Sequence, residues 1–357
     1  MQQPPQGAWS GHDQMKPAAE YDIRYGHNLV TDTSSNWRDY IAVTSPTAFS
    51  KVKPILAQLP KATSFPEAMD FEYLEGLTQD LPNASMVVGI GGGLALDAAK
   101  YVALRKQLPL VLVPTIVSTG AIIHSVFAKW EGRNLGDAAE WPWIDPEYVL
   151  VDYDVVLSAP SNLNIAGIGD VLCTYSTVCE WKRHTRLGNG EPYDPKQAVS
   201  MFDHHKEIIE KFPKTLDQKG QLTVESVDVI MKAVQDRDER NLRHPNAPAG
   251  DHSFIVAVEL ANDRSWVHGE LAALGAVIIA WQTGEKTSEF IADLDRCKVR
   301  WRPLAMGMKA DELHRGLREC ISYMGDTSRG RDMHSVLREE PVVDDRFEEL
   351  WAWLETL

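Results

Sequence analysis

The stretch GIGGGLALDAAK, residues 89–100, is the strongest indication of how the first half of this chain folds. Its three consecutive glycines, Gly91, Gly92 and Gly93, follow an apolar run and precede a helix-like segment. Glycines at such a turn let the backbone approach a phosphate, and a helix N-terminus attracts the negative charge. Because the stretch matches neither GxGxxG nor GxxxxGK[ST], it predicts a dinucleotide site of another kind, or a tight turn without a ligand.

Strand-like and helix-like segments alternate around this loop. Strands are expected at 40–44, 85–90, 108–113 and 148–152, with helices at 50–59 and 94–106. Apolar strands that alternate with helices are typical of a parallel sheet covered on both faces. After Pro160 the expected elements are helices, at 171–185, 194–212, 223–237, 268–284, 310–324 and 344–357. The sequence therefore predicts an α/β domain over 1–158 and an all-α domain over 159–357, with the first ~15 residues disordered.

The composition limits the classes of partner. The net charge of −15 over 357 residues disfavours a nucleic-acid binder or a protein of anionic membranes, which need clustered basic side chains. The four cysteines form no CxxC pair, which favours reduced thiols. No signal peptide and no apolar run of about 18 residues is apparent. We expect a cytoplasmic protein that acts on a small molecule.

The segment PTIVSTG, residues 114–120, follows the strand expected at 108–113. Ligands of doubly wound sheets bind outside the carboxyl ends of the strands, which would place Thr115, Ser118 and Thr119 beside the glycine loop. Their hydroxyl groups would bond phosphate or ribose, or would only form the turn. Asp97 and Lys100, three positions apart, would contact the same ligand or form an ion pair at the surface.

Three residues of metal-binding types stand in the second expected domain. Asp170 ends AGIGD, His252 lies in GDHSF and His268 in VHGEL. One carboxylate and two imidazoles suit zinc and leave a coordination position for substrate. Each also has an ordinary interpretation, because Asp170 is a candidate helix N-cap and either histidine would serve as a structural side chain. His204 and His205, in a charged helix, are expected at the surface.

The motifs GGGxxxDxxK, PTxxS, GxGD and H…HGE occur here in an order that resembles one family. That family contains glycerol dehydrogenase, sn-glycerol-1-phosphate dehydrogenase, iron-containing alcohol dehydrogenases and dehydroquinate synthase. The resemblance implies a Rossmann-like domain, a helical domain and a metal in the cleft between them. It implies zinc, with iron or nickel as alternatives, on the catalytic residues Asp170, His252 and His268. It also implies NAD or NADP on Gly91, Gly92, Gly93, Asp97, Thr115 and Ser118.

Several features indicate which branch of the family this chain resembles and where it departs from that branch. Iron-containing alcohol dehydrogenases carry a further His four residues after the metal-binding Asp, whereas this chain has Thr174, so the zinc branch is more similar. The segment RGRDMHSVL, residues 329–337, resembles the glycerol-1-phosphate dehydrogenase group. Members of these groups carry an Asp in the loop after PTxxS, where this chain has Gly120. Gly120 and His124 are therefore candidates for substrate contact, with packing as the alternative for His124.

The resemblance implies hydride transfer between a small polyol or polyol phosphate and nicotinamide, most like sn-glycerol-1-phosphate dehydrogenase. The metal acts as a Lewis acid and the cofactor carries the hydride. Thr44-Ser45-Pro46 contains no acid that would repel a 2′-phosphate, so NADP fits as well as NAD. The alternatives are a cyclase or lyase of the dehydroquinate synthase kind and a non-catalytic nucleotide-binding member. We also expect a homo-oligomer, a dimer or higher.

Overall fold

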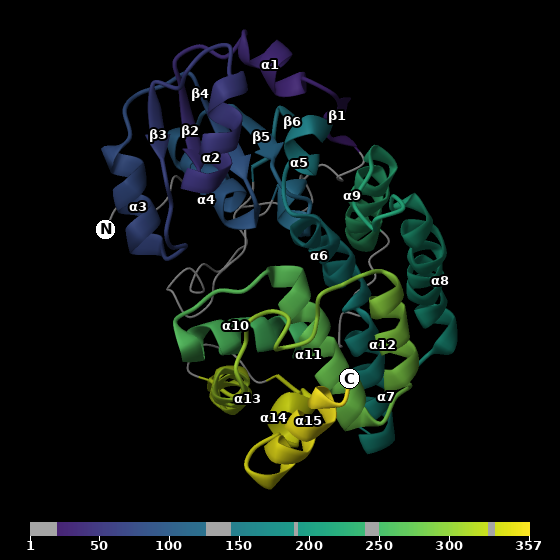
Figure 1. Ribbon diagram of the computed structural model, residues 1–357. Helices are drawn as coiled ribbons and strands as arrows, with labels where there is room; N and C mark the ends of the chain where they lie inside the picture. Colours follow the sequence, from purple (N-terminus) through teal and green to yellow (C-terminus); the bar gives the residue numbers. More distant parts are fainter. Residues whose placement is uncertain (1–19, 126–143, 189–191, 240–249, 328–332) are drawn as a thin grey trace. The chain divides into compact units, whose positions relative to one another are not determined.

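The computed structural model describes residues 20–125, 144–188, 192–239, 250–327 and 333–357 (Figure 1). The expected disorder of the N-terminal residues lies outside this part of the chain. The chain divides into two compact units. One contains the residues up to Asn164 together with Gln221–Met231, and the other contains Ile165–Gly220 and Lys232–Leu357. This division rests on spatial proximity alone, and the domain limits 1–158 and 159–357 stay a prediction.

The first unit is built on a six-stranded parallel sheet, which confirms the predicted α/β class. The strand order is β1-β6-β5-β4-β2-β3. The four predicted strands appear within two residues of their expected limits, whereas the edge strands β1 and β3 were not predicted. The strands are β1 (Ile23–Gly26), β2 (Tyr40–Thr44), β3 (Ala62–Ser64), β4 (Met86–Gly91), β5 (Leu110–Pro114) and β6 (Tyr148–Asp152).

Helices of this unit lie beside the sheet (Figure 1), and most residues of α4 are buried. These helices are α1 (Leu29–Ser34), α2 (Pro46–Val52), α3 (Phe71–Asp80), α4 (Gly93–Lys106) and α5 (Tyr153–Leu157). The helix expected at 50–59 was wrong in its limits. Its observed start is earlier because Ser45 accepts a hydrogen bond from the Ala48 amide and Pro46 occupies the first turn.

The remaining helices are α6 (Ser161–Leu172), α7 (Tyr175–Leu187), α8 (Pro195–Lys211), α9 (Val224–Glu239), α10 (Gly250–Asn262), α11 (His268–Thr283), α12 (Thr287–Arg296), α13 (Ala310–Met324), α14 (Val336–Glu339) and α15 (Asp345–Glu355). They confirm a helical second unit, although α6 and α9 begin in the first unit. Among them α6, α10, α12 and α14 were not predicted. α11 lies at the centre of the second unit, since every residue from Gly269 to Ala280 is buried. α7, α10, α12 and α14 pack against α11.

The described residues also bear on the state of the cysteines and on membrane-spanning helices. All four cysteines are free and buried. Among the described helices, none is both long enough and apolar enough to cross a membrane.

A buried carboxyl group joins α7 to the segment that precedes α14. Glu180 is fully buried, and its Oε1 accepts hydrogen bonds from the Ser335 hydroxyl at 2.5 Å and the Val336 amide at 3.0 Å. Burial raises the pKa of Glu180 to about 8; the two hydrogen bonds and Arg183 oppose the rise, and Asp251 adds to it. This carboxyl group is therefore protonated in the folded protein at pH values where it ionises in the unfolded chain.

The position of Glu180 predicts a pH-dependent stability. A raised folded-state pKa means that the contribution is complete below the unfolded value of 4.5 and is lost as pH rises toward about 8. Between these values the free energy of unfolding should fall by up to about 1.4 kcal/mol per pH unit. Glu180→Gln should remove this slope in urea unfolding at successive pH values. Glu349→Gln, at an exposed position, should leave it unchanged, and an unchanged slope in Glu180→Gln would contradict the assignment.

Candidate functional site

The glycine loop lies where β4 ends and α4 begins. Gly91 has a φ of 153°, and a Cβ there would lie 2.8 Å from the Cβ of Ala95. Gly92 occupies the N-cap position of α4, where a Cβ would lie 2.8 Å from the Ile116 side chain. Only glycine fits such positions without displacement of neighbours. The first turn of α4 contains no acidic side chain, so the positive end of the helix dipole is not neutralised there.

The loop lies at the switch point of the sheet. The chain leaves β2 toward β3 and leaves β4 toward β5, which stand on opposite sides of the β2–β4 pair. In doubly wound sheets this divergence opens the crevice that binds ligands. The carboxyl ends of β2, β4 and β5 are neighbours here, because Thr44 pairs with Ile90 and Gly91 with Pro114. This arrangement suits an elongated nucleotide.

The residues after β5 lie against the glycine loop. The Thr115 amide donates a hydrogen bond to the Gly91 carbonyl at 2.9 Å. A Cβ on Gly93 would lie 3.2 Å from Cγ2 of Thr119, so this helix start and that loop are in close proximity. Ser118 is buried, at 5% exposure. The structure thus brings together Gly91, Gly93, Thr115 and Thr119, while their role in cofactor binding stays a prediction.

Asp97 and Lys100 form a buried ion pair, so the alternative of a pair at the surface was wrong. The Lys100 ammonium lies 2.8 Å from Oδ1 of Asp97 and donates a hydrogen bond to the Ala121 carbonyl at 2.6 Å. Lys100 is completely buried and Asp97 is 3% exposed. Burial lowers the pKa of Lys100, and the Asp97 carboxylate opposes that change. The pair holds the loop after β5 against α4, which gives Asp97 a positioning role.

The two substrate candidates lie in the loop that Lys100 anchors. Gly120 is buried and begins a short 3-10 turn, and its carbonyl accepts the His124 amide at 3.1 Å. His124 is partly exposed. Sequence reasoning missed Asn164, which fixes the same loop by accepting the Val117 amide at 2.8 Å and donating to the Val156 carbonyl at 3.1 Å. An isolated Asn after Pro160 gave no signal of that role.

The end of β2 carries no acidic group near the glycine loop. The Thr44 hydroxyl donates to the Ser45 carbonyl, and the Ser45 side chain caps α2. These side chains are small and already engaged in local hydrogen bonds. The absence of a carboxylate from Thr44-Ser45-Pro46 leaves room for either form of the nicotinamide cofactor.

Asp170 is the centre of a second cluster, in the helical unit. It lies in the last turn of α6, which corrects the expectation of an N-cap: the helix begins at Ser161 and not after Asp170. Its side chain is completely buried, and Oδ2 forms a 2.7 Å ion pair with Arg237 of α9. Burial opposes ionisation of this carboxyl group. The charge of Arg237 and the imidazoles of His252 and His268 nevertheless hold its pKa well below the usual range.

Both predicted histidines converge on the other oxygen of Asp170. Nε2 of His252, in the first turn of α10, lies 3.5 Å from Oδ1, and Nε2 of His268, the first residue of α11, lies 3.4 Å from it. The two imidazole rings are 5.1 Å apart. Nδ1 of His252 lies 3.1 Å from Oδ2 of Asp251, which orients its Nε2 toward Asp170. The structure therefore brings Asp170, His252 and His268 together from three helices.

This donor set fits a divalent metal ion. Oδ1 of Asp170 is buried and has no hydrogen-bond partner within the described chain. The two imidazole nitrogens that face it are too distant for well-formed hydrogen bonds. A buried, ionised oxygen without a hydrogen bond is costly unless a cation compensates it. One carboxylate and two imidazoles are also the ligands that zinc accepts with a position left open.

Two glycines bring the helices of this cluster close together. A Cβ on Gly169 would lie 2.5 Å from the Gly269 carbonyl oxygen, and a Cβ on Gly269 would overlap the Ala166 carbonyl oxygen. The last turns of α6 and the first turn of α11 therefore touch through their backbones. This contact sets the separation between Asp170 and His268.

The expectation that His204 and His205 lie at the surface was wrong. His204 is 1% exposed and His205 is 6% exposed. Nε2 of His205 lies 2.7 Å from the Thr174 hydroxyl, and burial lowers the pKa of His205 to about 3. The two histidines belong to the inner face of α8, although the helix carries many charged residues.

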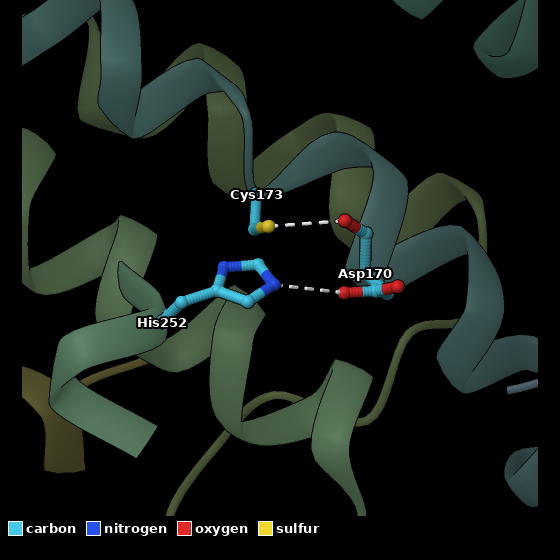
Figure 2. A group of neighbouring side chains, drawn as sticks. All are labelled: Asp170, Cys173 and His252. Carbon is cyan, nitrogen blue, oxygen red and sulfur yellow. Dashed lines mark hydrogen bonds and ion pairs between the residues drawn. The ribbon is translucent and has the colours of Figure 1, made fainter. Parts of the chain in front are cut away.

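Sequence reasoning also missed Cys173, which follows α6 directly. Its sulfur, one Asp170 carboxylate oxygen and one His252 ring nitrogen all lie within 4.8 Å of one another (Figure 2). Cys173 is completely buried, and burial together with the carboxylates of Asp251 and Asp170 raises the pKa of its thiol. Its spacing of three residues from Asp170 was the available signal, because residues three apart share a helix face.

Known proteins resemble this chain in sequence. Residues 40–160 match the family model described as iron-containing alcohol dehydrogenase. Glycerol-1-phosphate dehydrogenase [NAD(P)+] of Thermoplasma volcanium is 28% identical over 274 residues, which cover 72% of this chain and 76% of that protein. The enzyme of the same name from Hyperthermus butylicus is 31% identical over 218 residues, 60% of each chain.

Solved structures share the fold. A probable glycerol dehydrogenase from Sinorhizobium meliloti superposes with a TM-score of 0.65 at 18% identity, over 94% of this chain and 97% of that one. Glycerol dehydrogenase from Schizosaccharomyces pombe gives a TM-score of 0.60 at 17% identity, over 94% and 90% of the chains. Residues 40–160 are thus similar to iron-containing alcohol dehydrogenases, and the chain as a whole is similar to glycerol-1-phosphate dehydrogenases in sequence and to glycerol dehydrogenases in fold.

Thr174 has a defined place in the packing of the helical unit. It stands four residues after Asp170, where the iron branch was expected to carry a further histidine. The Thr174 side chain is buried and its hydroxyl is engaged with His205 of α8. The position therefore contributes to packing between α6, α7 and α8, and the candidate metal ligands described near Asp170 are His252, His268 and Cys173.

Proposed function

We propose that this protein is a metal-dependent, NAD(P)-linked dehydrogenase of a small polyol or polyol phosphate. The observation that carries the proposal is the convergence of His252 and His268 on the buried Oδ1 of Asp170. When bound, a divalent ion supplies Lewis acidity toward the substrate oxygen, and the nicotinamide exchanges the hydride. Asp170, His252 and His268 would hold the ion, with zinc as the preferred metal and iron or nickel as alternatives.

The glycine loop supports a nicotinamide dinucleotide as the cofactor. In it, Gly91, Gly92 and Gly93 admit the pyrophosphate to the N-terminus of α4, and Thr115 and Ser118 contact the cofactor from the end of β5. The buried ion pair of Asp97 and Lys100 holds the loop after β5 against α4, whose N-terminus carries the glycine loop. Similarity to proteins named glycerol-1-phosphate dehydrogenase [NAD(P)+] supports this choice of cofactor.

The substrate we favour is dihydroxyacetone phosphate, reduced to sn-glycerol 1-phosphate. The similarity to the two archaeal enzymes supports it. Gly120 stands where the related dehydrogenases were expected to carry an Asp, so the contact to substrate there must differ. His124, four residues after that position, is the side chain we propose for a polar contact to the substrate. The expected homo-oligomeric state stays a prediction.

A ketone screen tests the function. Zinc-loaded protein should oxidise NADH or NADPH with dihydroxyacetone phosphate, and less rapidly with dihydroxyacetone, when the cofactor absorbance is followed. His268→Ala should lose bound zinc and at least about 100-fold in kcat/KM, equivalent to about 2.7 kcal/mol. His27→Ala removes an exposed imidazole and should keep both.

Two results would overturn the proposal. Failure of either cofactor to be oxidised with any small ketone would reject the dehydrogenase, and a product formed without net cofactor turnover would indicate a cyclase or lyase instead. Zinc retained by His268→Ala with full turnover would reject the metal ligands.

A further inference from the structure

The cluster around Asp170 contains a donor that the proposed ligand set does not use. Figure 2 shows the Cys173 side chain beside Asp170 on the same stretch of chain, with His252 facing both from another helix. The sulfur, a carboxylate oxygen and an imidazole nitrogen lie within 4.8 Å of one another. Asp170 and Cys173 are fully buried, and His252 is mostly buried, with 23% of its side chain exposed.

Local structure explains why the sulfur lies there. Cys173 follows the last turn of α6, and its amide continues the helical hydrogen bonding by donating to the Gly169 carbonyl at 3.0 Å. The thiol donates to the Asp170 carbonyl at 3.0 Å, the usual local partner of a cysteine at this spacing. Asp170 and Cys173 therefore point to the same side of α6.

A second observation indicates that this side is built for a cation. Oδ1 of Asp170 is buried and accepts no hydrogen bond within the described chain, although His252 and His268 both face it. The sulfur lies within 4.8 Å of a carboxylate oxygen of this same side chain. Thiolate, imidazole and carboxylate together suit zinc and other borderline or soft ions, whereas magnesium and manganese prefer oxygen ligands.

We propose that Cys173 is a thiolate ligand of the ion held by Asp170 and His252 in the substrate-free protein. The inference rests on the proposed metal site and adds a fourth protein ligand to it. On binding, the S–H bond breaks, the sulfur keeps the electron pair and shares it with the ion, and the proton passes to solvent. No oxidation occurs. The thiolate makes the centre prefer zinc, cobalt(II) or cadmium over magnesium and manganese.

Cadmium binding to the full chain tests this ligand. Titration of the substrate-free wild-type protein with cadmium should produce an ultraviolet thiolate-to-metal charge-transfer band. Cys173→Ser and Cys173→Ala should lack the band and bind cadmium at least about tenfold more weakly, with a smaller change for manganese. Cys179→Ser removes another buried thiol and should keep the band. Thermal unfolding of the metal-free variants checks that each one folds.

The outcomes separate this inference from the proposed function. If wild-type protein binds cadmium and reduces a ketone but shows no such band, Cys173 is not a ligand and only this inference fails. A charge-transfer band that persists in Cys173→Ser would likewise show that Cys173 is not the ligand. If wild-type protein binds no divalent ion at all, the proposed metal site and this inference both fail.

Discussion

Asp170→Asn should abolish metal binding and turnover and should also destabilise the protein. An amide cannot supply the negative charge that Oδ1 presents to His252 and His268. We expect loss of bound zinc and at least about a 100-fold fall in kcat/KM. The same change removes the carboxylate that pairs with Arg237 at 2.7 Å in a buried setting. Breaking one side of a buried ion pair costs about 3 kcal/mol or more of unfolding free energy.

A double variant separates the two effects. Arg237→Met in the Asp170→Asn background removes the buried charge that has lost its partner, so it should recover most of the stability measured by urea unfolding. It should recover no zinc, because the carboxylate is still absent. Recovery of zinc in the double variant would contradict the role of Asp170 as a ligand, and full stability of Asp170→Asn alone would contradict the importance of the ion pair.

Gly269→Ala should disrupt the same site because it changes the close contact between the backbones of α6 and α11. The added Cβ would overlap the Ala166 carbonyl oxygen and lie 3.0 Å from the Asp170 amide nitrogen. Neither is the end of a flexible side chain, so α6 and α11 must separate. Overpacking of this kind costs about 1–3 kcal/mol. Because His268 precedes Gly269, its imidazole moves away from Asp170, and a displacement of about 1 Å can cost about 100-fold in rate.

A second glycine provides the matched control. Gly76 lies within α3 and a Cβ there would have nothing within 4 Å. Gly76→Ala should therefore stabilise the protein by up to about 1 kcal/mol, since alanine favours the helix. Zinc content, kcat/KM and urea midpoints of both variants measure the effect. Gly269→Ala with wild-type zinc affinity and stability would show that the helices tolerate separation there.

The central strands could be predicted from the sequence, and the edge strands could not. The residues of β2 and β5 form continuous apolar runs because both faces of these strands are covered. β1 reads IRYG and β3 reads ATS, and both are short and partly exposed. An edge strand forms because a neighbour offers hydrogen bonds, which is information that a local pattern does not contain.

α6 was missed for a reason that also concerns the site. Asp170 was considered as the N-cap of a helix that follows it, and the glycines of NIAGIGD weaken an isolated helix before it. In the folded chain Gly169 is required within the helix, since the backbone of Gly269 approaches it closely. The ligands Asp170, His252 and His268 could be proposed from motif order. Arg237 could not, because its proximity to Asp170 depends on how the helices pack. Cys173 was missed although its spacing of three residues from Asp170 was visible in the sequence.

The Lys100 anchor also determines how substrate preference can change. Besides its ion pair with Asp97, its ammonium group donates a hydrogen bond to a main-chain carbonyl of the loop, that of Ala121. Every amino acid carries such a carbonyl, so replacements at positions 120 and 124 leave this attachment in place. Sequence drift or laboratory selection can therefore exchange the side chains that would face a substrate while the path of the loop stays fixed. The residues proposed to face a substrate can therefore change without loss of the contact by which Lys100 holds the loop after β5.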